Sequence, residues 1–217
     1  MARPIHGYKN AAGKKIPGTT TIIGRFKESG GLLHWAFKQG QSGASHLYEQ
    51  RDTAAAAGTI AHDLIEHTIL GKKFEPGPLD ADLLTKAQNA HTQFLEWYSQ
   101  SRIEIVATEH VYVSERYQFG GTVDAIGRDT QGRIVLIDWK TSNAVYQDYL
   151  IQLAAYALLI EECQPEWTPQ AFHLLRVSKE SADFTHHYFG ELEDGKRAFE
   201  LMRELYEIDY RLKKRAA

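Results

Sequence analysis

Residues 120–142 read GGTVDAIGRDTQGRIVLIDWKTS, and this stretch decides the fold of the 217-residue chain. Apolar runs at residues 123–126 and 134–137 flank a turn that carries Gly132. Aliphatic and β-branched runs of this length around a glycine-bearing turn are typical of a β-hairpin. We therefore expect two antiparallel strands joined by a tight turn.

Charged residues stand in this hairpin where apolar residues would be expected. Asp124 lies inside the first strand, and Asp138 and Lys140 close the second. Residues two apart in a strand share a face, so Asp138 and Lys140 point the same way, and antiparallel pairing can bring Asp124 next to Asp138. Two close carboxylates repel unless a cation lies between them, and oxygen ligands suit Mg²⁺ or Mn²⁺. A lysine beside such a site can hold an anionic phosphate.

The alternative interpretation is a surface hairpin in which Asp138 and Lys140 form a salt bridge. That interpretation is preferable for an isolated Asp-x-Lys, because the tripeptide is common. Here the acids end a strand that is predicted to be buried, which favours the metal site.

Length and composition favour one soluble domain. Hydrophobic residues make up 43% of the chain, which is enough for one core. Residues 1–73 carry 10 Lys and Arg against 5 Asp and Glu, whereas residues 74–217 carry 15 against 23. This asymmetry fits a basic portion that faces an anion, and it also fits a solvated surface. The single cysteine, Cys163, excludes a disulfide framework and a four-cysteine iron–sulfur cluster. Without an 18-residue apolar run or a signal-peptide core, we expect a cytoplasmic protein with no membrane contact.

Hydrophobic periodicity predicts an α/β (α+β) domain built on one mixed sheet with flanking helices. Residues 1–100 are mainly helical, residues 101–190 form the sheet core, and residues 191–217 form a closing helix. Besides the hairpin, we expect a turn-rich start over 4–17, helices over 19–26, 31–39, 45–70, 79–101, 146–162 and 191–214, and strands over 103–114, 170–178 and 183–189. The helix after the hairpin predicts a crossover to a parallel strand.

The N-terminal segment PGTTTIIGRFK holds candidates for nucleic-acid contacts. Thr19 or Thr20 is predicted to cap a helix, and the amides at that helix start could hold a phosphate. Trp35, near Arg25 and Lys27, could stack on bases. A simple cap and core packing are the alternatives.

A helical segment, GTIAHDLIEH, carries a candidate metal ligand. His62 and Glu66 are four residues apart and share a helix face, and a neutral imidazole can join carboxylates on a metal. An exposed polar face is the alternative. The His62-Asp63 dipeptide also suggests HD phosphohydrolases, but these need further His and Asp residues on other helices. Only His91 is available for that purpose.

Four motifs in order, GTIAHxxxE, GTVD, IDWKTS and QLAAY, resemble the PD-(D/E)XK nuclease superfamily over roughly residues 15–160. Within it the chain resembles RecB-family exonucleases, including the mitochondrial genome maintenance exonuclease and phage-encoded relatives. Asp138 stands where many relatives have Glu, and both types occur in the superfamily. The resemblance implies a restriction-endonuclease-like core without the four cysteines of iron–sulfur relatives.

The resemblance also implies roles for named residues. Asp124, Asp138, the main-chain carbonyl of Trp139 and His62 would bind Mg²⁺ or Mn²⁺, with Glu66 or Glu109 in reserve. Lys140 would orient or deprotonate the attacking water, and Gln152 would hold the lysine or the scissile phosphate. Tyr156 would line the DNA channel, and Ser142, Thr20, Arg25, Lys27 and Trp35 are further candidates for DNA contacts.

The function implied is a metal-dependent DNA exonuclease that leaves 5′-phosphates. Its substrate would be single-stranded or end-containing DNA in phage or bacterial replication, recombination or repair, where a partner protein could act with it. A non-catalytic DNA-binding module, a nuclease subunit of a larger complex and an HD-type nucleotide phosphohydrolase remain alternatives.

Overall fold

A computed structural model describes residues 4, 7–27, 30–41, 49–181 and 183–216. Within these ranges only the backbone is described at residues 31, 32, 35, 39, 49–52 and 54.

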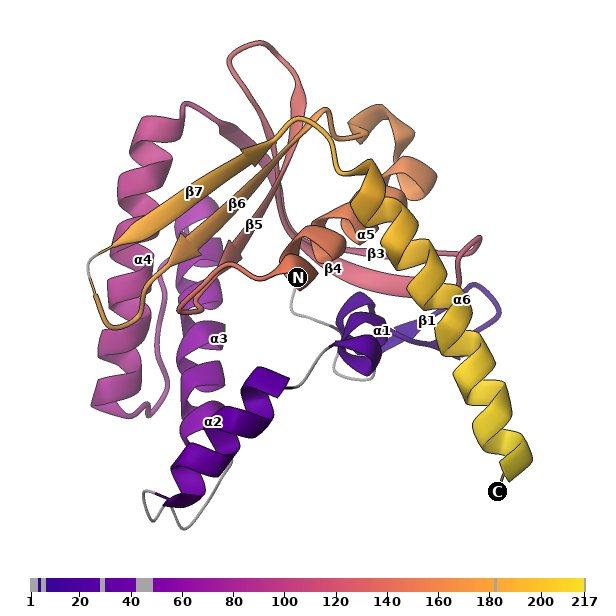
Figure 1. Ribbon diagram of the computed structural model, residues 1–217. Helices are drawn as coiled ribbons and strands as arrows, with labels where there is room; N and C mark the ends of the chain where they lie inside the picture. The colour runs from indigo at the N-terminus through magenta and orange to yellow at the C-terminus, as the bar shows by residue number, and fades with distance from the viewer. Residues whose placement is uncertain (1–3, 5–6, 28–29, 42–48, 182, 217) are drawn as a thin grey trace.

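A five-stranded mixed sheet forms the centre of the molecule (Figure 1), and its strands follow one another in chain order. The strands are β3 (Glu104–Ser114), β4 (Phe119–Arg128), β5 (Ile134–Lys140), β6 (Ala171–Val177) and β7 (Phe184–Phe189). Neighbouring strands are antiparallel except β5 and β6, which are parallel. The predicted hairpin, mixed sheet and crossover are therefore confirmed.

Helices cover both faces of the sheet (Figure 1). Helices α3 (Glu49–Ile69) and α4 (Ala81–Ser101) pack on one face and bury one hydrophobic cluster. Helix α5 (Gln147–Cys163) packs on the other face with α1 (Thr19–Phe26) and α6 (Glu193–Ala216), around a second cluster. A 3₁₀ turn, η1 (Pro165–Trp167), follows α5, and α2 (Gly30–Gln41) lies between α1 and α3 in the chain. Among the described helices, none combines the length and apolar character that a membrane span needs.

Strand β5 contributes to both hydrophobic clusters because its side chains alternate. Val135, Ile137 and Trp139 pack with α3 and α4, whereas Ile134 and Leu136 pack with α5. This alternation explains the continuous apolar run, since a strand covered on both faces needs no polar side. It also directs Asp138 and Lys140 toward the α5 face.

A small hairpin of β1 (Tyr8–Lys9) and β2 (Lys15–Ile16) precedes α1, as the turn-rich start predicts. The predicted threonine cap of α1 is wrong: Gly18 is the N-cap, with no side-chain cap bond. Thr19 is instead the first helical residue, and its hydroxyl donates to the carbonyl of Gly120, 3.1 Å away. Gly18 and Gly120 also form an isolated parallel bridge. These contacts attach the N-terminal segment to the start of β4.

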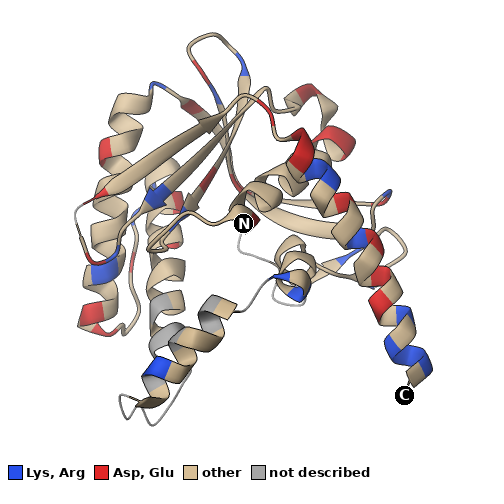
Figure 2. Cartoon of the chain, in the orientation of Figure 1, with Lys and Arg blue, Asp and Glu red and all other residues tan. Residues whose placement is uncertain are grey.

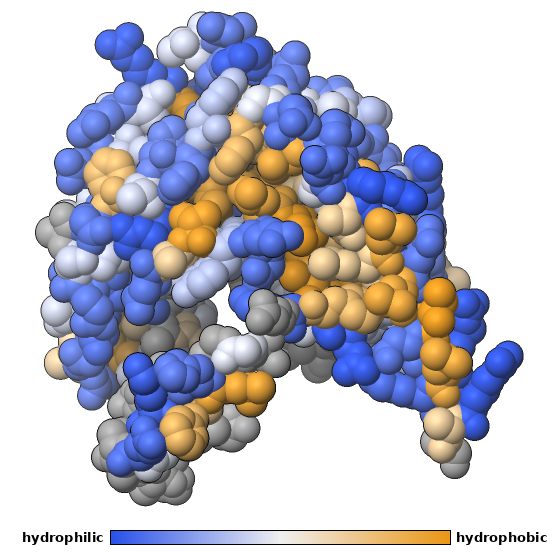
Figure 3. Space-filling view, in the orientation of Figure 1, coloured by the Kyte–Doolittle hydropathy of each residue, from blue (hydrophilic) through white to orange (hydrophobic). Residues whose placement is uncertain are grey.

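Helix α6 has apolar residues on two sides. Phe199, Met202 and Tyr206 pack against the core, whereas Leu201, Leu205, Ile208 and Leu212 are exposed. Figure 3 shows this apolar surface on the lower part of α6. Charged residues of both signs stand between the apolar ones, with basic residues at the end of the helix (Figure 2).

Candidate active site

The site forms where β4 and β5 separate. Their ladder ends at the pair Ala125–Ile137, and the next residues in register are Asp124 and Asp138. The amide of Trp139 donates to Asp124 Oδ2 at 3.1 Å. A carboxylate oxygen therefore accepts this hydrogen bond at the point where the strand ladder ends. Both aspartates are buried. The hairpin therefore brings the two acids to one place, as its period of two predicts.

A cluster of three metal-ligand side chains surrounds Asp124. His62 from α3, Glu109 from β3 and Asp124 each offer a ligand atom, and these atoms lie within 4.8 Å of one another. His62 Nδ1 lies 3.7 Å from Glu109 Oε1 and 3.8 Å from Asp124 Oδ1. The indole N–H of Trp139 donates to His62 Nδ1 at 3.1 Å. Trp139 therefore orients the imidazole toward the acids.

Glu109 reaches the cluster through an unusual backbone conformation. Its φ of 47° is in the left-handed region, although it lies within a strand. Non-glycine residues rarely adopt this conformation, and it persists mainly where the surroundings enforce it, often at functional sites. Glu66 and Glu109 were both expected as reserve ligands. The structure brings Glu109 into the cluster and leaves Glu66 outside it.

Gly58 allows α3 to approach the end of β5. A Cβ at this position would lie 2.7 Å from Thr141 Oγ1, closer than real Cβ contacts allow. Thr141 directly follows Lys140, and His62 lies about one helical turn after Gly58. The glycine that weakens the helical pattern thus positions the histidine.

Asp138 and Lys140 form a buried ion pair on the α5 side. Lys140 Nζ donates to Asp138 Oδ1 at 2.7 Å and lies 2.5 Å from Oδ2. Oδ2 nevertheless accepts no hydrogen bond of standard geometry from the described residues. The Lys140 ammonium also lies 5.3 Å from the ring centroid of Tyr149 on α5.

Each charge of this pair counteracts the effect of burial on the pKa of the other. Burial raises the pKa of Asp138 to about 7; the Lys140 charge counteracts this shift, and the Asp124 charge adds to it. Burial lowers the pKa of Lys140, but the Asp138 and Asp124 carboxylates outweigh it, so its pKa is raised overall. Lys140 is therefore an ammonium ion beside two acids.

The donor set fits a hard divalent cation. It combines the carboxylates of Glu109 and Asp124 with the imidazole of His62, and the buried carboxylate of Asp138, paired with Lys140, stands next to Asp124. Oxygen-rich sites with one imidazole suit Mg²⁺ or Mn²⁺. A cation would also relieve the repulsion between Asp124 and Asp138.

A family model for the PD-(D/E)XK nuclease superfamily matches residues 14–213. The chain belongs to this superfamily. The match extends beyond the 15–160 region in which the four motifs occur, and it supports a nuclease activity. No curated protein matches the sequence.

Solved structures resemble the nuclease at low identity. An alkaline exonuclease from Laribacter hongkongensis is 14% identical, with 73% of this chain and 84% of that chain covered and a TM-score of 0.39. A protein from Eubacterium rectale, provisionally assigned as an exonuclease, is 13% identical with a TM-score of 0.43. That alignment covers 69% of the nuclease and 64% of the E. rectale chain.

The arrangement does not favour an HD phosphohydrolase. Asp63 is exposed, outside the cluster that contains its neighbour His62. His91 Nε2 is hydrogen-bonded to Thr68 Oγ1 at 2.7 Å. Of the His62-Asp63 dipeptide, only His62 therefore belongs to the metal-ligand cluster.

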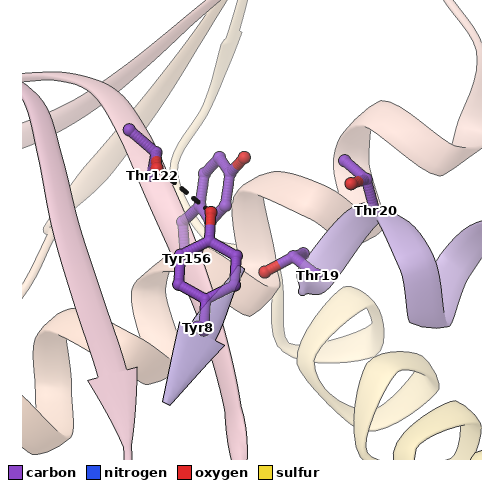
Figure 4. A pocket seen from close by; sticks show the side chains of 6 residues that line it. Tyr8, Thr19, Thr20, Thr122 and Tyr156 are labelled. Atoms are coloured by element: carbon purple, nitrogen blue, oxygen red, sulfur yellow. Dashed lines mark hydrogen bonds between the residues drawn. The ribbon is translucent and has the colours of Figure 1, made fainter. Parts of the chain in front are cut away.

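Gln152, expected at the lysine or the scissile phosphate, and Tyr156, expected in the DNA channel, both lie on α5. Gln152 Nε2 donates to the hydroxyl of Tyr156 at 2.6 Å, and both residues are buried. Tyr156 lines a cavity of about 60 Å³ together with Tyr8, Thr19, Thr20, Gly121 and Thr122 (Figure 4). A Cβ at Gly121 would lie 2.8 Å from Tyr156 Cε1, so this glycine makes room for the ring.

Two other expected contacts, Arg25 and Lys27, form ion pairs with neighbouring elements. Arg25 pairs with Asp209 of α6 through two hydrogen bonds of 3.0 and 2.9 Å. Lys27 Nζ lies 2.5 Å from Asp148 Oδ2 at the start of α5. These charges connect α1 to its neighbours, which the sequence alone did not predict.

Ser142 and Trp35 are the last two of the expected DNA contacts. Ser142 donates to the carbonyl of Ala144 at 2.7 Å in the loop after β5. Trp35 lies on α2, but its side chain is outside the described part of the structure.

Proposed function

We propose that this nuclease is a divalent-cation-dependent DNA exonuclease of the RecB type. It would hydrolyse phosphodiester bonds in single-stranded or end-containing DNA and leave 5′-phosphates. The observation that carries the proposal is the buried Asp138–Lys140 pair beside the cluster of His62, Glu109 and Asp124. A scaffold does not need an ion pair buried beside a cluster of two acids and an imidazole, because burial of each group costs desolvation free energy.

The cation site would use Asp124, Asp138, His62 and the main-chain carbonyl of Trp139. We add Glu109 on the basis of its place in the cluster. A bound Mg²⁺ or Mn²⁺ would offset phosphate charge and lower the pKa of a bound water. The indole N–H of Trp139 donates to His62 Nδ1, the ring nitrogen 3.7 and 3.8 Å from the two acids, so this hydrogen bond would be released when that lone pair binds the cation.

Lys140 would act as a positioned charge. Its ammonium can donate to a non-bridging phosphate oxygen in place of Asp138, and the charge that develops there strengthens the bond. A role as proton acceptor requires Lys140 to lose its proton first, which the neighbouring carboxylates disfavour. Gln152 would hold Lys140 or the scissile phosphate, and Tyr156 would line the DNA channel.

The test is cleavage of end-labelled single-stranded, duplex and circular DNA with Mg²⁺, Mn²⁺ or EDTA. We expect shortening of linear DNA only with a divalent cation, products that ligate through a 5′-phosphate, and loss of cleavage in Asp124→Asn and Asp138→Asn. Cation-dependent cutting of circular DNA would mean an endonuclease instead. DNA binding without cleavage under every condition would favour the non-catalytic module. Hydrolysis of dNTPs alone would favour a nucleotide phosphohydrolase.

A further inference from the structure

A large groove lies between the β1–β2 hairpin, the start of α1 and the inner side of α6. Its volume is about 840 Å³, within the range of organic ligand sites. Residues from both ends of the chain line it, including Lys14, Lys15, Arg203, Tyr206 and Tyr210. The cation cluster, by which we mean His62, Glu109 and Asp124, contributes none of its residues to this lining.

The groove combines positive charge with aromatic rings. Lys14 and Lys15 supply positive charge, and Arg203 forms an ion pair of 3.4 Å with Glu207, the one acid among the described lining residues. Arg203 is held in place by hydrogen bonds to the carbonyls of Tyr117 and Gln118, at 2.8 and 3.3 Å. Its guanidinium is therefore fixed on the α6 wall, next to its partner Glu207.

Tyr8, Tyr206 and Tyr210 provide the aromatic surfaces. Tyr210 is half exposed, and Tyr206 is partly buried against the core. Aromatic faces beside cations are the combination that holds single strands, since unpaired bases stack on the rings while the cations follow the phosphates. Duplex DNA hides its base faces and cannot use the tyrosines in this way.

The groove continues toward the candidate active site. It shares Tyr8 and Thr20 with the small cavity of Figure 4, which extends to Thr122 and Tyr156. Thr122 precedes Asp124 by two residues in β4. The tyrosine at the junction is fixed, because its hydroxyl is hydrogen-bonded to Thr122 Oγ1 at 3.0 Å. Its ring also occupies the space where a Cβ of Gly120 would lie, 2.4 Å from Tyr8 Cγ.

We propose that this groove binds a single-stranded segment of the DNA substrate, several nucleotides away from the bond that is cut. The proposal rests on the proposed nuclease function and specifies the form of its substrate. The phosphates would contact Lys14 and Lys15, and a base would stack on Tyr210, whose ring centroid lies 4.7 Å from the Lys214 ammonium. The groove would thus hold the strand while the cation cluster acts on its end.

The first test measures binding of a 20-nucleotide single strand, in Ca²⁺, over a range of salt concentrations. Lys14→Glu/Lys15→Glu should weaken binding at low salt about tenfold or more and make the logarithmic salt slope shallower by about 1.4, or 0.7 for each lost phosphate contact. Lys72→Glu/Lys73→Glu, the same charge change in the exposed loop after α3, should bind like the wild type. If both doubles weaken binding equally, the groove has no special role and the proposal fails.

The second test removes a ring. Tyr210→Ala should weaken single-strand binding about tenfold because one stacked base is lost, whereas Tyr210→Phe should bind normally. Neither change should weaken binding of blunt duplex DNA. Equal losses on duplex and single strands would overturn the proposal.

Cleavage kinetics on short and long strands distinguish failure of the groove proposal from failure of the nuclease proposal. The groove variants should keep wild-type kcat on a strand too short to reach the groove, and should show a raised KM only on longer strands. If the wild type cleaves long strands and the groove variants match it in KM, the groove proposal is wrong although the nuclease proposal stands. If no DNA is cleaved but the groove variants still lose single-strand binding, the nuclease proposal fails and the groove remains.

Discussion

At the scale of single residues, Lys140 is the group whose removal most directly tests the chemistry. Lys140→Ala should lower kcat by on the order of 10²–10³, because a positioned charge opposite the developing phosphate charge is lost. Lys140→Arg should not restore activity, since the planar guanidinium differs in shape from an ammonium and cannot take its place beside Asp138. Single-turnover cleavage with saturating Mn²⁺ measures both effects.

The same substitution also affects folding. Without a cation, Lys140→Ala leaves Asp138 buried beside Asp124 without its lysine partner, which raises the pKa of Asp138 further and favours its protonated form. DNA affinity in Ca²⁺ serves as the control and should change little. Cleavage at the wild-type rate combined with a lower melting temperature would mean that Lys140 is only a salt-bridge partner, and that the hairpin is scaffold.

Part of this site could be predicted from the residues alone. The period of two in a strand predicts that Asp138 and Lys140 share a face, and the period of a helix singles out His62. Glu109 could not be ranked, because its place depends on a left-handed φ that no residue type announces. The indole of Trp139 was likewise missed, since its contact with His62 joins residues that are 77 positions apart.

At the scale of elements, Gly58 tests the contact of α3 with the end of β5. In an exposed helix Ala is more stable than Gly by about 1 kcal/mol. Gly58→Ala should nevertheless destabilise the protein and weaken Mn²⁺ binding, because the new Cβ overlaps with Thr141 Oγ1. Chemical denaturation and a Mn²⁺ titration measure the two effects.

Two further variants make that prediction specific. Thr141→Ala removes the overlapping oxygen, so the double variant should recover most of the loss. Gly24→Ala in α1 places a Cβ in open space and should be neutral or stabilising. A Gly58→Ala protein that is more stable than the wild type would show that the helix is not held closely against Thr141.

Strands β6 and β7 carry a pH-dependent pair. His173 Nδ1 and His186 Nε2 are 2.8 Å apart, and burial, together with the charge of His186, lowers the pKa of His173 to about 4. An unfolded histidine has a pKa of about 6.5, so between these values the unfolded chain binds more protons. The free energy of unfolding should therefore fall by up to about 3 kcal/mol as the pH drops from about 6.5 to 4. His173→Gln should flatten this slope in urea titrations, whereas His67→Gln should not. An unchanged slope in His173→Gln would assign the pH dependence to other groups.

Element types followed the sequence closely because long periodic patterns specify them. The start of α1 was predicted wrongly, because Gly18 and the threonine next to it can both serve as the N-cap. Gly18 takes the cap since the nearby Thr19 hydroxyl is used by Gly120 of β4. The ion pairs of Arg25 and Lys27 were also missed, because they join α1 to residues more than 100 positions away.

At the scale of the whole molecule, cation binding should appear as added stability, because the cluster assembles residues from α3, β3 and β4 that only the folded chain brings together. A ligand at 100 times its Kd stabilises the folded state by about 2.7 kcal/mol. For a chain of this size that raises Tm by roughly 5–10 °C. Differential scanning fluorimetry with Mn²⁺ measures the shift without reference to activity.

Asp124→Asn decides whether this stabilisation arises at the proposed site. The amide still accepts the hydrogen bond from the Trp139 amide, but it no longer repels Asp138 and is a poorer ligand. Without a cation the variant should therefore melt at the wild-type temperature or above it, and with Mn²⁺ it should lose most of the upward shift. Glu75→Gln, which removes an exposed carboxylate from the loop after α3, should keep the full shift. If Asp124→Asn is destabilised without Mn²⁺ and keeps the shift, Asp124 supports the fold and the cation binds elsewhere. A scaffold residue cannot produce this pattern, because its loss lowers Tm whether or not Mn²⁺ is present.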